Sequence, residues 1–232
     1  MRLLLFDIDG TLIRGDQAGR RAMGAALEHV FGTKGSLDTY PMGGKTDMGI
    51  ASDVLLQAGL NQEEIDDKMA FFYAMMAEFA REIYPTREIS RCPGVGPLLV
   101  ELRDRDDVLL GLLTGNAYTT APLKLSAAGI DPDQFVIAAF GSENLDRNNL
   151  PAIAFQRANA LSKNPITGDH TVIIGDTPAD ILCARAGGAT AVAVASGWHT
   201  ANTLLQYKPD YIFTDLSDTE AVLQVLLGHK GE

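Results

Sequence analysis

The first twelve residues place two carboxylates directly after a short apolar run. Leu3 to Phe6 is apolar, and the sequence Asp-Ile-Asp-Gly-Thr-Leu follows it from residue 7. A short apolar run that ends in a turn signal is typical of a strand buried on both faces of a parallel sheet. Because ligands of such sheets bind at the carboxyl ends of the strands, Asp7 and Asp9 are predicted to lie in a binding crevice.

Two crowded carboxylates repel each other, so they require a cation or a proton between them. Mg²⁺ prefers oxygen ligands and binds through one or two carboxylates, waters and a phosphate. The pair therefore predicts a Mg²⁺ site with Asp7 as a nucleophile towards phosphorus. The alternative is a loop in which Asp9 and Gly10 form a turn that Asp7 caps. The motif is expected by chance on the order of 10⁻⁴ times in such a chain, which favours the catalytic interpretation.

The composition is that of a globular protein without a polyanionic partner. The 232 residues are 46% hydrophobic and 21% charged, with a net charge of −11. This charge argues against nucleic acid or an anionic membrane as a partner but leaves a small phosphorylated metabolite possible. Cys92 and Cys183 lack the spacing of a disulfide framework or zinc site. With no signal peptide or membrane span recognisable, we expect a cytoplasmic monomer or homodimer.

The chain contains two regions with different hydrophobic patterns. From about residue 14 to residue 85, Ala, Met, Leu and Phe recur at helical spacing, and helices are predicted at 22–31, 47–58 and from a capping box at Asn61 to Pro85. The Met and aromatic stripe of the last helix is typical of core packing. We expect an all-helical cap domain at 14–85, inserted after the first strand of a core domain formed by 1–13 and 86–232.

Beyond residue 93 the pattern alternates between strand and helix. Strands are predicted at 108–113, 135–140, 171–174 and 190–195, with an edge strand at 211–214, and helices at 95–105, 148–161 and 217–227. A further helix is predicted from a cap at Thr119 or Thr120 to Gly129. This alternation predicts an α/β fold with a Rossmann-like parallel sheet and helices on both faces.

Polar side chains follow two more of the predicted strands. Thr114, Gly115 and Asn116 offer a hydroxyl, an amide and exposed N–H groups, which suits the binding of phosphoryl oxygens. Asp176 follows another strand and is placed to complete a metal site. Asp180 lies four residues on, where it both fits a capping box and points back towards the site.

These motifs resemble those of the haloacid dehalogenase superfamily, and the insert is similar to the cap of its phosphoglycolate phosphatase and β-phosphoglucomutase branch. The resemblance implies that Asp7 forms an aspartyl-phosphate and that Asp9 is the general acid and base. It implies direct Mg²⁺ ligation by Asp7, Asp176 and the backbone carbonyl of Asp9, with Asp180 behind them. Thr114, Gly115 and Asn116 would bind the phosphoryl group. A carboxylate at Asp9 favours a phosphate ester as substrate, with a phosphosugar mutase as the alternative activity.

The lysine that this family carries in its third motif is absent from residues 146–151, and Lys163 comes too late. Arg147 is the predicted substitute, because a guanidinium can bridge phosphate and carboxylate oxygens. The alternative is a surface arginine paired with Glu143 or Asp146.

Two further positions have open interpretations. Lys45, in a glycine-rich turn before a helix capped by Thr46, either binds the substrate or is a solvated lysine. Trp198 and His199 follow the fifth core strand, and we expect a packed tryptophan and a helix-capping neighbour there. A receiver-like binding protein is the alternative from another class, but receivers are half this length and lack a cap. A dinucleotide enzyme is not indicated, since no glycine-rich fingerprint opens a helix after a strand.

Overall fold

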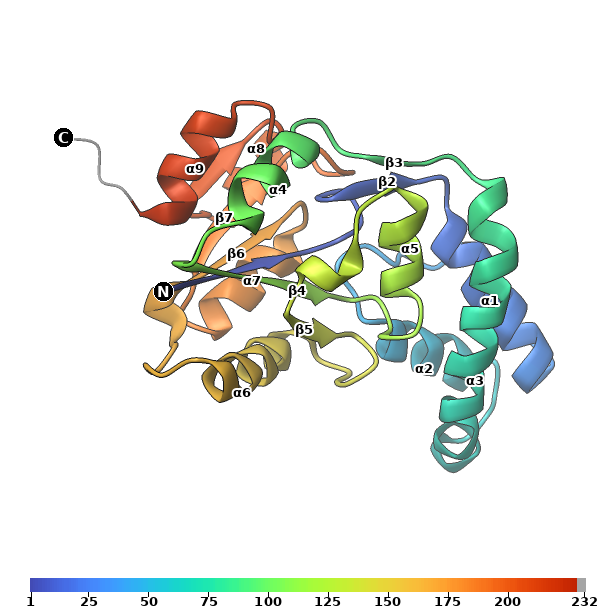
Figure 1. Cartoon of the computed structure of the whole chain (residues 1–232). Helices are drawn as coiled ribbons and strands as arrows, with labels where there is room; N and C mark the ends of the chain where they lie inside the picture. Colours follow the sequence, from blue (N-terminus) through green and yellow to red (C-terminus); the bar gives the residue numbers. More distant parts are fainter. Residues whose placement is uncertain (229–232) are drawn as a thin grey trace.

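The structure is a computed structural model that describes residues 1–228, and its centre is a six-stranded parallel sheet (Figure 1). The strand order is β5-β4-β1-β6-β7-β8, and every neighbouring pair is parallel. The strands are β1 (Arg2–Phe6), β4 (Val108–Thr114), β5 (Ile137–Phe140), β6 (Thr171–Gly175), β7 (Thr190–Val194) and β8 (Tyr211–Phe213). The predicted α/β fold class is confirmed, and β8 is the predicted edge strand.

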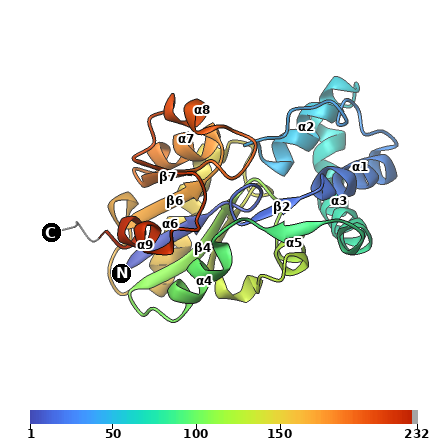
Figure 2. The ribbon, with the colours of Figure 1, turned by 90° about the horizontal axis from the view of Figure 1, so that it is seen from above.

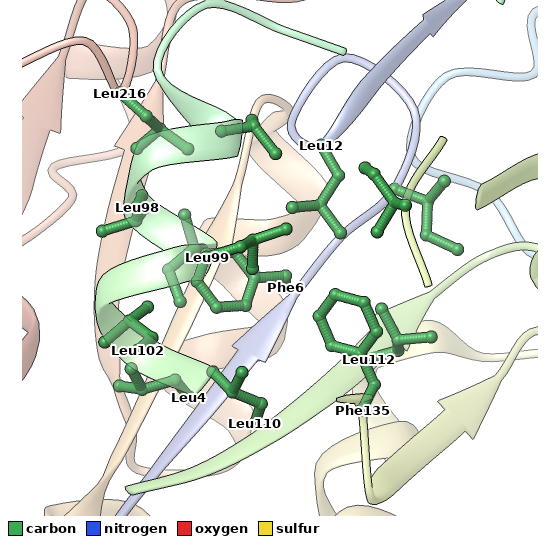
Figure 3. Close-up of a cluster of buried hydrophobic side chains, with 14 of the residues drawn as sticks. Leu4, Phe6, Leu12, Leu98, Leu99, Leu102, Leu110, Leu112, Phe135 and Leu216 are labelled. Carbon is green, nitrogen blue, oxygen red and sulfur yellow. The ribbon is translucent and has the colours of Figure 1, made fainter. Parts of the chain in front are cut away.

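Helices cover both faces of the sheet. Alternate side chains of β1 enter different cores: Leu4 and Phe6 belong to one apolar cluster and Leu3 and Leu5 to another, and all four are fully buried. Burial of each such side chain contributes about 1.5–3 kcal/mol. The first cluster (Figure 3) packs against α4 (Val95–Arg103), α5 (Ala121–Ala127) and α9 (Thr219–Leu227). The second packs against α6 (Leu150–Leu161), α7 (Pro178–Ala186) and α8 (Ala201–Leu205).

Residues 14–85, hereafter the helical insert, contain three helices to one side of the sheet (Figure 2). These are α1 (Ala18–Phe31), α2 (Asp47–Gln57) and α3 (Gln62–Ile83), which build a third apolar cluster that also includes Ala117 from the loop after β4. Helix α1 ends where Gly32 adopts a left-handed conformation with φ 73°. Asn61 and Glu64 form the predicted capping box at the start of α3.

A two-stranded ribbon that the sequence analysis missed joins the insert to the sheet. Strands β2 (Ile13–Gly15) and β3 (Ile89–Arg91) pair antiparallel, so both connections run side by side. An ion pair between Arg87 and Asp16, with an N–O distance of 3.0 Å, lies beside it. Three-residue strands are too short to show a period of two, which explains why the pattern gave no sign of them.

Several predicted boundaries are wrong by a few residues, each for a local reason. Strand β5 begins at Ile137 because the turn η2 (Pro132–Gln134) precedes it, and α6 begins at Leu150 after η3 (Arg147–Asn149). The last helix begins at Thr219, since the side chain of Asp218 caps it. Two further turns are η1 (Tyr84–Thr86) after α3 and η4 (Gly168–His170) before β6. Within residues 1–228, no helix is both long and apolar enough to cross a membrane.

Candidate active site

Three adjacent strand ends bring the acidic side chains together. Strand β1 lies between β4 and β6, and Phe6 is in register with Leu112 and Ile174. The Asp7 backbone N–H donates to the Ile174 carbonyl at 2.9 Å. The residues that follow β1, β4 and β6 therefore share one edge of the sheet, which is where parallel sheets bind ligands.

A buried carboxylate cluster at this edge suits a divalent cation. Oxygens of Asp7, Asp176 and Asp180 lie within 4.8 Å of one another. The Asp176 Oδ2 atom is buried and has no hydrogen-bond partner among the described residues, although Thr11 approaches its Oδ1 at 3.5 Å. A buried acceptor without a donor is costly unless a ligand satisfies it. The donor set is all oxygen, which fits the hard Mg²⁺ ion that the sequence predicts.

Without a cation, burial dominates the electrostatics of this cluster. Burial, together with the charges of Asp7 and Asp180, raises the pKa of Asp176 to about 8. Burial also raises the pKa of Asp7 to about 7, with Arg147 acting in the opposite direction. The metal-free site therefore holds protons near neutral pH that a bound cation would displace.

These pKa shifts predict how the stability of the metal-free protein depends on pH. The ordinary value for Asp176 is 3.8, so between about pH 4 and pH 8 the folded state binds more protons at this residue than the unfolded state does. Its contribution to the free energy of unfolding therefore falls as pH rises through this window. We expect Asp176→Asn to stabilise the metal-free protein more at about pH 8 than at about pH 5, as measured by thermal unfolding.

The exposed Asp133→Asn is a matched control for that measurement, because Asp133 lies on a surface turn. We further expect Mg²⁺ to raise the unfolding temperature of the wild type more at the higher pH, since it binds the deprotonated cluster. A stabilisation by Asp176→Asn that is equal at both pH values would contradict the assignment.

Arg147 is a buried cation between two of these carboxylates. Its side chain is 7% exposed, its Nη2 lies 3.0 Å from Asp7 Oδ1, and it also donates to Asp180 Oδ1. The alternative of a surface arginine paired with Glu143 or Asp146 is wrong, because the Arg147 side chain is buried against Asp7 and Asp180, and Glu143 pairs with Arg157. Burial alone would lower the pKa of Arg147, but Asp180 and Asp7 raise it overall, so the guanidinium stays charged.

Asp180 forms the predicted capping box and also faces the carboxylate cluster. Its Oδ2 accepts hydrogen bonds from the backbone N–H and hydroxyl of Thr177, at 2.9 and 2.7 Å, in the predicted capping box of α7. Its Oδ1 meanwhile accepts from Arg147. The first turn of α7 thus fixes the carboxylate that holds Arg147 in place.

Asp9 lies apart from this cluster and contacts Lys124. The sequence did not predict Lys124 as a residue of the site. The Asp9 Oδ2 atom is 2.8 Å from both Lys124 Nζ and Asn116 Nδ2, and Lys124 also donates to Asn116 Oδ1 at 2.5 Å. Lys124 is 6% exposed and the Asp9 side chain 48%. Burial alone would lower the pKa of Lys124, but Asp9 raises it overall. The only sequence feature that could have indicated this contact is the position of Lys124 in the helix that closely follows Asn116.

The loop that follows β4, residues 115–117, makes hydrogen bonds to the helical insert. The hydroxyl of buried Thr114 accepts from Asn116 Nδ2 at 2.8 Å. The Gly115 carbonyl accepts from the Asp47 N–H at 2.7 Å, and Asp47 Oδ2 accepts from the Ala117 N–H at 2.7 Å. A side chain at Gly115 would collide with the backbone of the insert, so glycine permits this close approach. Burial raises the pKa of Asp47 to about 6.

Lys45 lies on this docked turn, and its side chain is about half exposed. Its ammonium pairs with Asp53 at 3.2 Å and donates to the Tyr40 hydroxyl. Thr46 caps α2 as predicted, since its hydroxyl accepts from the Gly49 N–H. Lys45 lines the same cavity as Asp7 and therefore forms part of the candidate site.

A cavity of about 520 Å³ opens above the strand ends, and the sequence-predicted site residues line it with the exception of Asp180. Trp198 also lines this cavity and is 84% exposed, so the prediction of a packed tryptophan is wrong. His199 does not cap a helix, because Thr200 is the N-cap of α8. The volume lies within the range of 300–1,000 Å³ that is usual for small-molecule sites.

Comparison with known proteins identifies the class of enzyme. A model of the family described as haloacid dehalogenase-like hydrolase matches residues 4–185, and a second model of HAD-like hydrolases matches residues 152–219. The chain therefore belongs to the haloacid dehalogenase-like hydrolase family. The predicted family and the expectation of a hydrolase are confirmed.

Named relatives are distant but match over nearly their whole length. The phosphoglycolate phosphatase of Photorhabdus laumondii is 23% identical over 94% of this chain and 90% of its own. The pyrophosphatase PpaX of Oceanobacillus iheyensis is 23% identical over 94% of each chain. Among solved structures, CbbY from Rhodobacter sphaeroides in complex with phosphate has a TM-score of 0.70 at 17% identity, covering 94% of this chain and 96% of that one. At such identity the structural likeness shows the fold alone.

Proposed function

We propose that the protein is a Mg²⁺-dependent phosphatase that hydrolyses phosphate monoesters of small metabolites through an aspartyl-phosphate on Asp7. The observation that carries this proposal is the position of Asp7, which faces the buried cation Arg147 and shares a carboxylate cluster with Asp176 at the cavity. The named relatives act on phosphoglycolate or pyrophosphate, which supports a small phosphorylated substrate. The proposed substrate class includes phosphoglycolate and sugar phosphates.

In this scheme an Asp7 carboxylate oxygen attacks phosphorus, and the bond from phosphorus to the leaving oxygen breaks. Arg147 lies close enough to Asp7 to stabilise charge on the phosphoryl oxygens, and the Thr114 hydroxyl and the Gly115 N–H would supply further donors. The Asn116 N–H donates to the Thr114 hydroxyl at 3.3 Å and would have to exchange that partner for the phosphoryl group. Mg²⁺, held by Asp7, Asp176 and the Asp9 carbonyl with Asp180 behind them, would neutralise charge on the substrate phosphate. Most of the rate enhancement then comes from positioning and electrostatics.

Asp9 supplies the proton that the leaving oxygen needs. It then takes a proton from the water that attacks the aspartyl-phosphate, which releases phosphate and regenerates Asp7. Lys124 and Asn116 fix the direction of its carboxylate, and its partial exposure to the cavity leaves it accessible to the leaving group. A positioned acid or base of this kind contributes about 10²–10⁴-fold.

The helical insert is proposed as a cap domain over this reaction, with 1–13 and 86–232 as the core. Its own apolar cluster and the β2/β3 ribbon that joins it to the sheet support this division. Motion about the ribbon would admit substrate, and Lys45 would contact the substrate from the cap. Both cysteines are free and buried, which suits a reducing compartment such as the cytoplasm. We propose a monomer or homodimer that acts without nucleic acid or membrane.

The test is phosphate release by the purified protein from p-nitrophenyl phosphate, phosphoglycolate, pyrophosphate and hexose phosphates. We expect release that requires Mg²⁺ and stops on chelation. The mutase alternative predicts instead that the phosphoryl group moves between positions of a hexose bisphosphate, which product analysis would show. Absence of both activities with Mg²⁺ present would refute the proposal.

A further inference from the structure

Trp198 is the one tryptophan of the sequence, and it is 84% exposed in a loop at the cavity. Large aromatic side chains usually bury most of their surface, because each removes 150–250 Å² of surface from water. None of the residues described contributes a more exposed large apolar side chain. An uncovered indole at a ligand cavity indicates a surface that is completed by a ligand.

The backbone beside Trp198 is fixed against the catalytic motifs. The Ser196 hydroxyl donates to the Gly10 carbonyl at 2.7 Å, and the Ser196 carbonyl accepts from Arg14 Nε and Nη2 at 3.0 and 2.7 Å. A Cβ at Gly197 would overlap the carboxylate of Asp176, so the loop lies directly on that residue. The contact between Gly197 and Asp176 therefore fixes where Trp198 lies relative to the carboxylate cluster.

The lining of the cavity combines polar and apolar side chains. Asp7, Asp176 and Arg147 line it together with the apolar side chains of Met42, Ile50, Met76 and Ile89. At about 30 Å³ per water, its volume of about 520 Å³ is much larger than a phosphate group requires. Room and apolar surface are therefore available for the part of the substrate beyond the phosphate.

We propose that Trp198 is a specificity-determining residue that stacks its indole on a flat face of the leaving group. This inference rests on the proposed phosphatase function and narrows its substrates. Such a face is provided by the C–H groups of a sugar ring or by an aromatic ring, whereas a two-carbon acid such as glycolate has none. Aromatic stacking contributes about 0.5–1.5 kcal/mol beyond area burial, equivalent to about a 2- to 13-fold effect.

Kinetics of Trp198→Ala and Trp198→Phe test this contact. With hexose 6-phosphates and p-nitrophenyl phosphate we expect Trp198→Ala to lower kcat/KM about tenfold, mainly through a higher KM, and Trp198→Phe to restore most of the loss. With phosphoglycolate we expect less than about a twofold change, since no ring is stacked. Comparison of the hexose and aryl esters shows which kind of ring the indole prefers. Tyr211→Ala is the matched control, because Tyr211 is exposed on β8 outside the cavity lining.

Because Trp198 is the single tryptophan, its fluorescence reports the contact directly. In the Asp7→Asn protein, which binds without turnover, we expect the ring-bearing esters to change tryptophan emission saturably and inorganic phosphate to change it little. Equal loss with ring-bearing and acyclic substrates, a preference of the wild type for acyclic esters, or a change in oligomeric state with unchanged kinetics would overturn the inference. Failure of the wild type to release phosphate from any ester would instead refute the phosphatase proposal.

Discussion

Asp7→Asn should lower phosphate release by at least about 10⁴-fold while leaving the fold intact. The amide has the shape of the carboxylate but is a far weaker nucleophile, so no aspartyl-phosphate forms. The measurement is single-turnover and steady-state phosphate release with Mg²⁺ and the best ester substrate. The exposed Asp133→Asn change is the control and should retain full activity.

The same variant separates catalysis from stability. Asp7 is 4% exposed and shares its site with Asp176 and Asp180, whose negative charges repel its carboxylate. The neutral amide removes this electrostatic repulsion. Arg147 keeps its contact with Asp180. We expect Asp7→Asn to unfold at a temperature equal to or above that of the metal-free wild type. Substantial phosphate release by the pure variant would show that phosphorus is attacked by another group.

The carboxyl ends of the strands were the most predictable part of the molecule. The apolar run before Asp7 forms a buried strand of a parallel sheet, so Asp7 lies at the carboxyl end of that strand. The same reasoning places Asp176 at the carboxyl end of the neighbouring strand. Capping boxes at Asn61 and Thr177 are also local patterns, set by residues three apart. Features that depend on one short segment of sequence could therefore be predicted from the chain.

Contacts between distant segments could not be predicted in this way. Lys124 looks like any lysine of an amphipathic helix until folding places its ammonium 2.8 Å from Asp9, which is 115 residues away in the sequence. Trp198 was expected to be packed because tryptophan usually is, and only the cavity beside it explains its exposure. The ribbon of β2 and β3 joins residues 13–15 to 89–91 across the whole helical insert.

Removing the buried cation is expected to have the largest effect on stability. Arg147→Met leaves Asp7, Asp176 and Asp180 together with no positive charge from residues 1–228 in contact, and loss of one partner from a buried ion pair costs about 3–5 kcal/mol. Because Arg147 lowers the pKa of both Asp7 and Asp176, its removal raises these pKa values further. The stability loss should therefore be larger at about pH 8 than at about pH 5, where the carboxylates take up protons instead.

Denaturant unfolding of Arg147→Met, Arg147→Lys and a surface control measures this cost. Arg157→Met removes a cation from a partly exposed pair with Glu143 and should cost less than about 1 kcal/mol. The Nη2 atom of Arg147 contacts both Asp7 and Asp180. Arg147→Lys keeps the charge on a shorter side chain without the planar guanidinium, so it should recover much of the stability and little of the phosphate release. If Arg147→Met were as stable as Arg157→Met at both pH values, the carboxylates would not depend on this guanidinium. The charge of the phosphoryl site would then have to be balanced by the metal and Lys124 alone.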